Sequence, residues 1–458
     1  MYQELHLTEG KDMSKNYTIR CRGLNENFNS VFNFNNAVFE TSGLLPGEKA
    51  EVSLLYGKGK GRAKVEKITE ISENRITPVC PVYESCGGCS FLHTSYENEL
   101  RLKTDVCKGL LSDFGEVKEC LGMNEADSFH YRNKVHATLA LNKKGRVTSG
   151  LYEETTHNLI PINECAIERP SAAEIMKTIR RFMDDYHLPP YNEDNRRGTL
   201  RHVLFRIAKN GDTLVCLVCG SKIFPEKHKL TDEIRKKHPC VKTVILNFNN
   251  KKTSFVLGDK EELLFGPGYI CDELCGIKFH ISAKSFYQIN TEMAEKIYTD
   301  AVKLSGIGKE DNILDAYCGI GTIAMTAAKL SGAKELTGVE LNPAAVRDAR
   351  ESAKNAGFNN LRFIDEDAGD FLQAAIGADL HYSCIIMDPP RSGASEHFLN
   401  AVAKMKPEKL IYISCNPATL ARDLRFLTSK KYKAEHIQPY DMFPRTANVE
   451  VLCILKHQ

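Results

Sequence analysis

The chain has 458 residues, and because one domain usually takes about 100–200 residues, we expect about two to four domains. Its formal net charge is only +2, so a nucleic-acid partner would have to be held by local basic patches. No apolar run approaches the roughly 18 residues of a membrane span, which argues against a membrane protein. Residues 1–16 are polar and show no secretory signal, which predicts a cytoplasmic protein. In that reducing compartment the 16 cysteines are expected to be metal ligands or nucleophiles rather than disulfides.

Residues 17–77 are rich in short strand-like runs and turn residues, which predict a small β-barrel. The runs are Tyr17–Arg22, Ala37–Thr41, Ala50–Leu55 and Ala63–Ile68. Between the last two lies a basic loop, Gly57–Arg62, whose glycines permit close approach and whose Lys and Arg side chains suit backbone phosphates. A solvated hairpin on a generic barrel is the simpler interpretation of this segment taken alone.

A cysteine cluster follows the predicted barrel. Cys80, Cys86 and Cys89 are separated by five and then two residues, and Gly87 and Gly88 let the chain wrap tightly. Three thiolates require a fourth ligand to close a site, and four thiolates suit both zinc and an iron–sulfur cluster. The spacing therefore predicts a metal site and leaves the metal open.

The middle of the chain is predicted to be largely β-structure. Residues 95–113 have apolar side chains at helical spacings and predict one helix. From about 126 to 280 the pattern is strand-like and is interrupted by a helix near Ser171–Tyr186. This arrangement predicts a central α+β domain.

In the last third of the chain, strand-like runs alternate with helical ones. The strand-like runs are Asn312–Tyr317, Glu335–Glu340, Leu361–Asp365, Cys384–Asp388, Lys409–Ser414, Ala434–Pro439 and Val449–Lys456. Strands separated by helices imply a parallel, doubly wound sheet, and the last strand, which is reached without a helix, must be antiparallel. This α/β, Rossmann-like sheet of seven strands is the class I S-adenosylmethionine (SAM) methyltransferase fold.

A glycine turn follows the first of these strands. Gly319 and Gly321 open a helix at the carboxyl edge of the sheet, where a ligand can approach the backbone. Met325 replaces the third glycine of the dinucleotide fingerprint, whereas SAM has no pyrophosphate and needs only the shorter turn. Glu340 ends the next strand, where a carboxylate can bind ribose hydroxyls. These residues alone would also suit a nucleotide other than SAM as the ligand. We expect Asp367 to cap a helix rather than contact adenine.

Two further motifs follow the fourth and fifth strands of the predicted sheet. Asp388 begins the run Asp-Pro-Pro-Arg, whose prolines fix the backbone and leave the carboxylate projecting into the cleft. Cys415 precedes Asn416, which suits a helix cap, and Pro417, which suits a first helical turn. We therefore expect the helix dipole to favour the Cys415 thiolate.

A thiolate beside a SAM site suits the methylation of uracil at carbon 5. Carbon 5 is a poor nucleophile, and addition of a thiolate to carbon 6 turns the ring into an enolate whose carbon 5 can attack the sulfonium methyl. A base must then remove the carbon 5 proton so that the thiolate can leave. Cys415 is the predicted nucleophile, Glu450 the predicted base and Asp388 the predicted partner of the uracil edge.

This intact set argues against a non-catalytic RNA-binding protein. DNA cytosine methylation places its nucleophile after the fourth strand, so we do not expect a DNA substrate.

Over almost its whole length the sequence resembles the RNA uridine-5-methyltransferases. The matching motifs are Tyr131–Lys134, Ser285–Asn290, Asp315–Thr322, Asp388–Arg391, Ser414–Pro417 and Phe443–Glu450. The residues that the resemblance implies as SAM contacts or as the lining of its pocket are Gln288, Tyr317, Glu340 and Asp388. Cys415 corresponds to the family's nucleophile and Glu450 to its base. Two positions depart from the family, because Asn448 stands where His is usual and Leu92 where Gln is common.

The resemblance also implies a cluster, an RNA-binding module and a substrate. Cys165 matches the family's distant cysteine, so the cluster is expected to be 4Fe–4S, and the segment Leu44–Glu48 resembles a TRAM domain, an OB-like RNA-binding module. The implied domains are TRAM 14–77, a cluster-bearing central domain 78–280 whose segment 95–120 packs with the catalytic domain in relatives, and a catalytic domain 281–458. The iron–sulfur branch mostly modifies 23S ribosomal RNA and some relatives modify the T-loop of transfer RNA. We therefore expect a monomer that acts on 23S RNA, with transfer RNA as the alternative.

Overall fold

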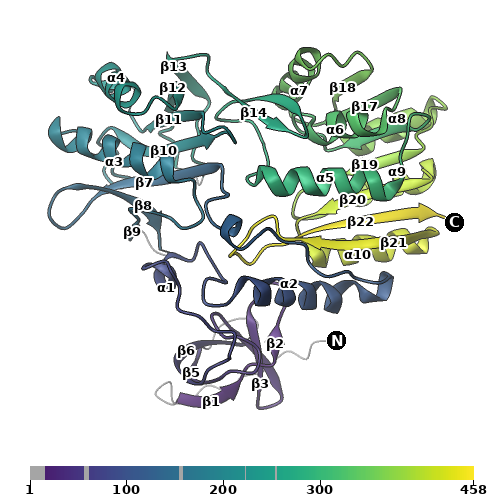
Figure 1. Cartoon of the computed structure of the whole chain (residues 1–458), viewed down its shortest axis with the longest axis horizontal. Coiled ribbons are helices and arrows are strands. Elements are labelled where there is room, and N and C mark those ends of the chain that lie inside the picture. Colours follow the sequence, from purple (N-terminus) through teal and green to yellow (C-terminus); the bar gives the residue numbers. More distant parts are fainter. Residues whose placement is uncertain (1–15, 56–60, 154–157, 222, 253–254) are drawn as a thin grey trace.

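The computed structural model describes residues 16–55, 61–153, 158–221, 223–252 and 255–458. Its three large sheets belong to an N-terminal β domain, a central domain and a C-terminal domain (Figure 1), which are coloured purple, teal, and green to yellow. Among these residues, no helix combines the length and the apolar character needed to cross a membrane.

The N-terminal β domain is a six-stranded sheet with the strand order β1-β5-β6-β4-β3-β2. Its strands are β1 (Asn16–Arg20), β2 (Gly23–Leu24), β3 (Ser30–Phe34), β4 (Ala37–Thr41), β5 (Lys49–Leu55) and β6 (Gly61–Glu70). Alternate residues of β3, β4 and β5 point into a small core of phenylalanine and aliphatic side chains. The predicted basic loop lies mostly outside the described residues, because only Gly61 and Arg62, at the start of β6, are described.

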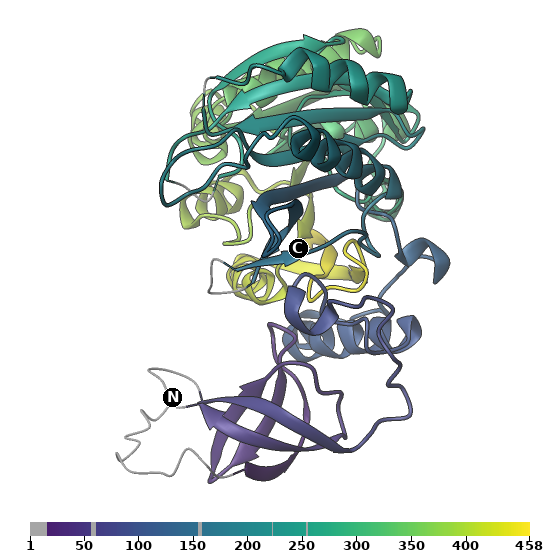
Figure 2. The same ribbon diagram turned by 90° about the vertical axis from the view of Figure 1, so that its left-hand side faces the viewer.

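The N-terminal β domain is fixed to the rest of the chain. The buried Glu48 carboxylate accepts hydrogen bonds from the Leu45 backbone N–H at 2.8 Å and from Arg75 Nε at 2.6 Å, which joins the sheet to the segment that leaves it. Phe28 contacts Phe91 edge to face, with 5.9 Å between ring centroids. In the view of Figure 2 this domain lies at one end of the molecule, directly below α2.

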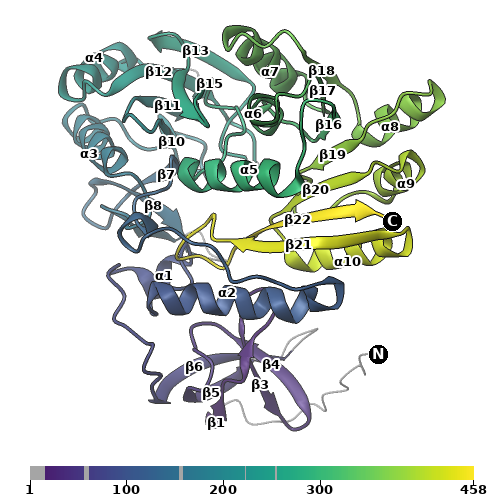
Figure 3. The same ribbon diagram turned by 45° about the vertical axis from the view of Figure 1, so that its right-hand side comes forward.

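Helix α2 (Tyr96–Leu111) lies between the N-terminal β domain and the C-terminal domain (Figures 1 and 3). Ser95 caps it by accepting a hydrogen bond from the Asn98 backbone N–H. Its apolar face, which includes Leu102 and Val106, is part of the hydrophobic core of the C-terminal domain, and the helix contacts α10 and β21. The short helix α1 (Tyr83–Cys86) precedes it.

The central domain is a seven-stranded sheet with the order β13-β12-β11-β10-β7-β8-β9. Its elements are β7 (Lys134–Leu141), β8 (Val147–Tyr152), β9 (Leu159–Pro161), α3 (Pro170–Asp185), β10 (Leu200–Ile207), β11 (Thr213–Cys219), α4 (Lys227–Lys237), β12 (Val241–Phe248) and β13 (Lys260–Phe265). Helices α3 and α4 cover one face. The expectation of one helix in this region was wrong, because α4 buries only Leu230, Thr231 and Ile234 among its eleven residues and has little apolar periodicity to detect.

The C-terminal domain contains the predicted class I methyltransferase sheet. The strand order is β18-β17-β16-β19-β20-β22-β21, and β22 is antiparallel to both of its neighbours. Its elements are α5 (Thr291–Ser305), β16 (Asn312–Ala316), α6 (Thr322–Ser331), β17 (Glu335–Glu340), α7 (Pro343–Asn355), β18 (Leu361–Asp365), α8 (Ala368–Gly377), β19 (Cys384–Met387), α9 (Glu396–Met405), β20 (Lys409–Ser414), α10 (Pro417–Ser429), β21 (Tyr432–Tyr440) and β22 (Glu450–His457). The predicted seven-stranded sheet is confirmed. A hairpin of β14 (Ile270–Leu274) and β15 (Ile277–Ile281) packs on α5 and α7.

Candidate active site

Five strand ends meet at one edge of the C-terminal sheet. The parallel strands β16, β17, β19 and β20 end there, and the antiparallel strand β22 begins there. Ser414 pairs with Val451, so the antiparallel register places Cys415 opposite Glu450. The adjacent strand β19 ends one residue before Asp388. Side chains far apart in the sequence are thus brought together at the edge where α/β folds bind their ligands.

The glycine turn between β16 and α6 leaves room for a ligand. Tyr317, Gly319 and Gly321 have left-handed φ angles of 66°, 55° and 79°. Glu340 closes the turn, because its carboxylate accepts hydrogen bonds from the backbone N–H of Gly319 at 3.2 Å and of Asn342 at 2.8 Å. A Cβ atom added to Gly319 would meet no atom within 4 Å, so open space lies where a ligand would approach. Both Glu340 oxygens keep a lone pair for a ligand hydroxyl.

The other predicted cofactor contacts lie near this turn. The Tyr317 ring packs edge to face on Phe398, with 5.3 Å between centroids. The Gln288 carbonyl accepts a hydrogen bond from Asn133 Nδ2 at 2.8 Å, which ties this segment to the central domain. Burial and the nearby Asp388 charge raise the pKa of Tyr298, whose hydroxyl interacts with the Gln288 side chain. Gln288 and Asp388 thus both act on Tyr298, which places Gln288 near the site.

Cys415 lies at the start of α10, as predicted, and Asn416 and Pro417 occupy the cap and the first turn. The expectation that the Cys415 thiolate would be favoured was wrong. Burial, together with the charges of Glu450 and Asp388, raises the pKa of Cys415 to about 12. Two nearby carboxylates and a half-buried position outweigh the partial positive charge of the helix end.

The two carboxyl groups of the site are also shifted from their ordinary ionisation. Burial raises the pKa of Asp388 to about 7. Burial and the Asp388 charge raise the pKa of Glu450 well above its usual range, and Glu450 Oε2 has no hydrogen-bond partner among the described residues. Two adjacent carboxylates cannot both carry a charge without a large cost, so the pair retains a proton near neutral pH.

Arg391 is the cation of this site, and no role was predicted for it from the sequence. It is exposed, and its charge opposes the raised pKa of both Cys415 and Glu450. Its Nη2 donates a hydrogen bond to Asn448 Oδ1 at 2.6 Å. Asn448 therefore holds this arginine in place. In the sequence, the Asp388–Arg391 motif was the only signal that Arg391 has a role. We call Asp388, Arg391, Cys415 and Glu450 the sheet-edge group.

Asp315 is a second ionisable residue near this site to which no role was assigned from the sequence. It lies fully buried in β16, and burial, followed by the Asp388 charge, raises its pKa well above the ordinary value. Glu340 acts in the same direction. An acidic residue inside a strand predicted to be buried was the signal that could have identified it, because such groups are rarely buried without a role.

The four predicted metal-binding cysteines gather from two distant segments. Burial, then Cys165, Cys86 and Cys80 in that order, raises the pKa of Cys89 to about 12. Burial and Glu168 raise the pKa of Cys165 to about 11, and Cys80 contributes to that shift. Thiols that disfavour one another's charge are the arrangement that a metal cation stabilises.

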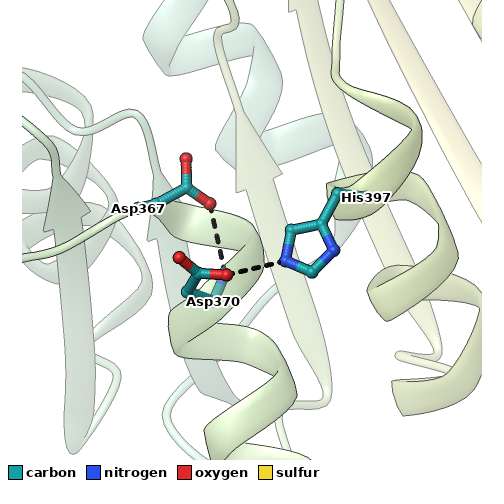
Figure 4. A group of neighbouring side chains, drawn as sticks. All are labelled: Asp367, Asp370 and His397. Carbon is teal, nitrogen blue, oxygen red and sulfur yellow. Dashed lines mark hydrogen bonds and ion pairs between the residues drawn. The ribbon is translucent and has the colours of Figure 1, made fainter.

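A different group of possible ligands lies on α8 and α9 (Figure 4). Asp367, Asp370 and His397 place their ligand atoms within 4.8 Å of one another. Asp367 accepts hydrogen bonds from the backbone N–H of Gly369 and Asp370, which confirms its predicted role as a helix cap. His397 Nε2 lies 2.9 Å from Asp370 Oδ1. A cap and an exposed ion pair thus account for this group.

Comparison with known proteins gives the family of this chain. Residues 95–458 match the model of the family described as tRNA (Uracil-5-)-methyltransferase. Uncharacterized RNA methyltransferases of Halalkalibacterium halodurans and Clostridium acetobutylicum are 37% and 35% identical, each over 90% of both chains.

A solved structure shares the fold over nearly the whole chain. The tRNA (uracil-54, C5)-methyltransferase of Pyrococcus abyssi, in complex with S-adenosyl-L-homocysteine, is 24% identical with a TM-score of 0.77, and the match covers 96% of this chain and 100% of that one. By the family model and the two bacterial relatives, the chain belongs to the tRNA (uracil-5-)-methyltransferase family of RNA-modifying enzymes.

Proposed function

We propose that this enzyme methylates carbon 5 of uridine in 23S ribosomal RNA, with SAM as the methyl donor and Cys415 as a covalent nucleophile. The observation that carries the proposal is the strand register, which sets Cys415 opposite Glu450 at the edge that Asp388 shares. A nucleophile, a base and a hydrogen-bonding carboxyl group are the three groups that the reaction requires.

The glycine turn provides the SAM site. Glu340 would hold the ribose hydroxyls, the open space at Gly319 would admit the ligand, and Tyr317 and Gln288 would line the pocket. When bound, SAM supplies an electrophilic methyl group on a sulfonium cation. Asp388 lies between this pocket and Cys415, so it would orient the uracil edge.

The charges of the sheet-edge group fit the order of the steps. Arg391 opposes the raised pKa of Cys415, which favours the thiolate that adds to carbon 6 of uracil. Once the sulfur is bonded to carbon, it no longer carries a charge that repels the Glu450 carboxylate. Glu450 can then accept the carbon 5 proton, after which the carbon–sulfur bond breaks and Cys415 is released.

We also propose that Cys80, Cys86, Cys89 and Cys165 hold a 4Fe–4S cluster with a structural role. The thiols of two distant segments raise one another's pKa, which supports a shared metal site, and the choice of 4Fe–4S over zinc follows from the resemblance to the iron–sulfur branch.

The cluster has a direct analytical test. Anaerobically purified protein should contain iron and acid-labile sulfide in equal amounts, and Cys165→Ala should lose both. Cys271→Ala, which changes an exposed cysteine outside the cluster, should retain them. Zinc in place of iron, or a full and stable cluster in the Cys165 variant, would refute this ligand set.

The RNA target is inferred from the domain set. We propose that the N-terminal β domain is a TRAM module, supported by its six-stranded sheet, in which the edge strand β1 also contacts β3, and by the buried Glu48 of the Leu44–Glu48 segment. A domain fixed beside the catalytic domain can bind RNA at a set distance from Cys415. The cluster favours ribosomal RNA, as in the iron–sulfur branch that the sequence resembles, whereas the solved relative named for transfer RNA supports the alternative.

The test is methyl transfer from labelled SAM, under anaerobic conditions, to unmodified 23S ribosomal RNA and transfer RNA in parallel reactions. Label recovered as 5-methyluridine from 23S RNA is the expected result. Label confined to transfer RNA would replace the substrate and keep the chemistry, and label in a nucleoside other than 5-methyluridine would refute the chemistry.

A further inference from the structure

The loop 441–449, which leads from β21 into Glu450, is held by buried charges. Lys103 Nζ on α2 lies 2.8 Å from Glu99 Oε1 and 2.6 Å from Asp441 Oδ1, and the Lys103, Glu99 and Asp441 side chains are fully buried. Arg445 is 1% exposed, and its Nη1 lies 3.8 Å from Glu99 Oε2. We call Glu99, Lys103, Asp441 and Arg445 the buried ion-pair cluster. Because a buried charge that loses its partner is costly, this cluster favours one arrangement of the loop.

The backbone of Arg445 joins this loop to the cysteine-rich segment 78–94. Its carbonyl accepts hydrogen bonds from the backbone N–H of Ser90 at 2.8 Å and of Phe91 at 3.1 Å, and Ser90 directly follows Cys89. Its own N–H donates to Glu99 Oε1 at 2.7 Å. Arg445 has a φ angle of 68°, a left-handed conformation that is uncommon for arginine and must be maintained by its surroundings.

The side chain of Arg445 maintains that conformation. Nε and Nη2 donate to Ser128 Oγ at 3.2 and 2.9 Å. The guanidinium also lies over the rings of Tyr96 and Phe129, 4.8 and 4.6 Å from their centroids. These contacts reach two separate parts of the chain, helix α2 and residues 128–129, so the side chain fixes the loop relative to both.

A series of hydrogen bonds leads to the sheet-edge group from Thr446, the residue that directly follows Arg445. Thr446 Oγ1 donates to the Phe443 carbonyl at 2.8 Å, and Asn448 Nδ2 donates to Thr446 Oγ1 at 3.0 Å. Asn448 Oδ1 accepts from Arg391 Nη2 at 2.6 Å. The position of Glu450, which directly follows this loop, therefore depends on how Arg445 is held.

We infer that Arg445 is a positioning residue, which transmits the arrangement of the cysteine-rich segment to Glu450. The inference rests on the proposed function, because it assigns Arg445 to the step in which Glu450 acts. In that step the carbon 5 proton moves to Glu450, its bonding electrons form the carbon 5–carbon 6 double bond, and the carbon–sulfur bond breaks to release the Cys415 thiolate. A misplaced Glu450 would leave the methylated uracil attached to Cys415.

The experiment measures turnover and the covalent enzyme–RNA adduct together. For Arg445→Ala we expect kcat to fall by about 100-fold with little change in KM, since a small displacement of a catalytic group has effects of this order. A denaturant-stable adduct carrying labelled methyl should accumulate, as it should for Glu450→Gln. Arg445→Lys, which keeps the charge, should recover part of kcat and reduce the adduct.

Two further variants separate positioning from loss of folding. Ser128→Ala removes the hydroxyl that Arg445 contacts and should trap a smaller amount of adduct. Arg201→Ala changes another buried arginine, whose Nε lies 2.5 Å from Glu193 Oε1 in the central domain, and should lower stability without trapping adduct. Loss of turnover in Arg445→Ala without methylated adduct, while Glu450→Gln traps it, would overturn this inference and leave the proposed function intact. Failure of the unmodified enzyme to methylate RNA would overturn the proposed function itself.

Discussion

Two groups of ionisable side chains meet at the loop 441–449 and at Glu450, which directly follows it, and their charges are balanced differently. In the buried ion-pair cluster two cations face two carboxyl groups, as where Lys103 contacts both Glu99 and Asp441. Burial raises the pKa of Glu99 to about 7 even there, but Lys103 and Arg445 act in the opposite direction. In the sheet-edge group the acidic groups outnumber the single cation Arg391, and all three acidic groups have raised pKa values.

This difference separates structural charges from reactive ones. Paired buried charges gain their stability from a fixed geometry and therefore hold the backbone that carries them. Unpaired buried groups keep protons that can be moved, which is the property that acid–base and nucleophilic catalysis need. Each variant below changes a residue in one of the two groups. If both groups respond alike, the distinction between structural and reactive charges is wrong.

The largest effect is expected for Cys415→Ala. Methyl transfer should be abolished while the melting temperature changes little, because the Cys415 side chain is small and only half-buried. Cys453→Ala is the matched control, since this thiol is fully buried in β22 and its loss should cost about 1 kcal/mol of stability without loss of turnover. Near-normal turnover by the Cys415 variant would contradict the assignment.

Glu450→Gln should have the next largest effect. The variant keeps the shape of the side chain and removes the base, so kcat should fall by about 10²–10⁴-fold. Because addition and methylation precede the step that needs the base, a methylated enzyme–RNA adduct should appear on denaturing gels. Full turnover, or loss of turnover without adduct, would assign the base to another residue.

Lys103→Met tests the paired group. The variant leaves Glu99 and Asp441 buried without a cation, so the free energy of unfolding should fall by about 3–5 kcal/mol in urea titrations. Lys108→Met, on the exposed face of the same helix, should give no measurable change. A Lys103 variant as stable as the Lys108 variant would show that the cluster does not hold the loop.

The smallest effect concerns the pH dependence of stability. Burial raises the pKa of Asp388 from 3.8 to about 7, so the folded protein binds more protons than the unfolded chain in this range. The free energy of unfolding should therefore decrease as the pH rises from about 4 to 7. Asp388→Asn removes this contribution, so its stability should decrease less over the same range. Equal decreases in both proteins would show that Asp388 is not held neutral.

Strong patterns in the sequence predicted the sheet and the residues at its edge. The strands Glu335–Glu340, Leu361–Asp365 and Lys409–Ser414 have the predicted bounds, because each contains at least one β-branched residue and lies between helical segments and turn residues. The order of motifs along an α/β sheet then placed Cys415 and Glu450 at one edge.

The remaining features depend on contacts that no local pattern records. The Cys415 pKa is set by two carboxyl groups from other strands, so the dipole argument from α10 alone gave the wrong direction. Helix α4 presents too few apolar residues for its period to be visible. Arg445 and Asn448 lie between two predicted strands, and their importance follows from partners that are distant in the sequence. These partners are Glu99 for Arg445 and Arg391 for Asn448, and no spacing rule identifies either of them.

The central claim is that Cys415 attacks carbon 6 of uracil, and RNA that contains 5-fluorouridine tests it most directly. Fluorine at carbon 5 cannot be removed as a proton, so the reaction should stop after methylation with the enzyme and RNA still bonded. The expected result is a denaturant-stable adduct that carries one methyl group and maps to the peptide containing Cys415. An adduct at another residue, or release of methylated RNA without any adduct, would contradict the account.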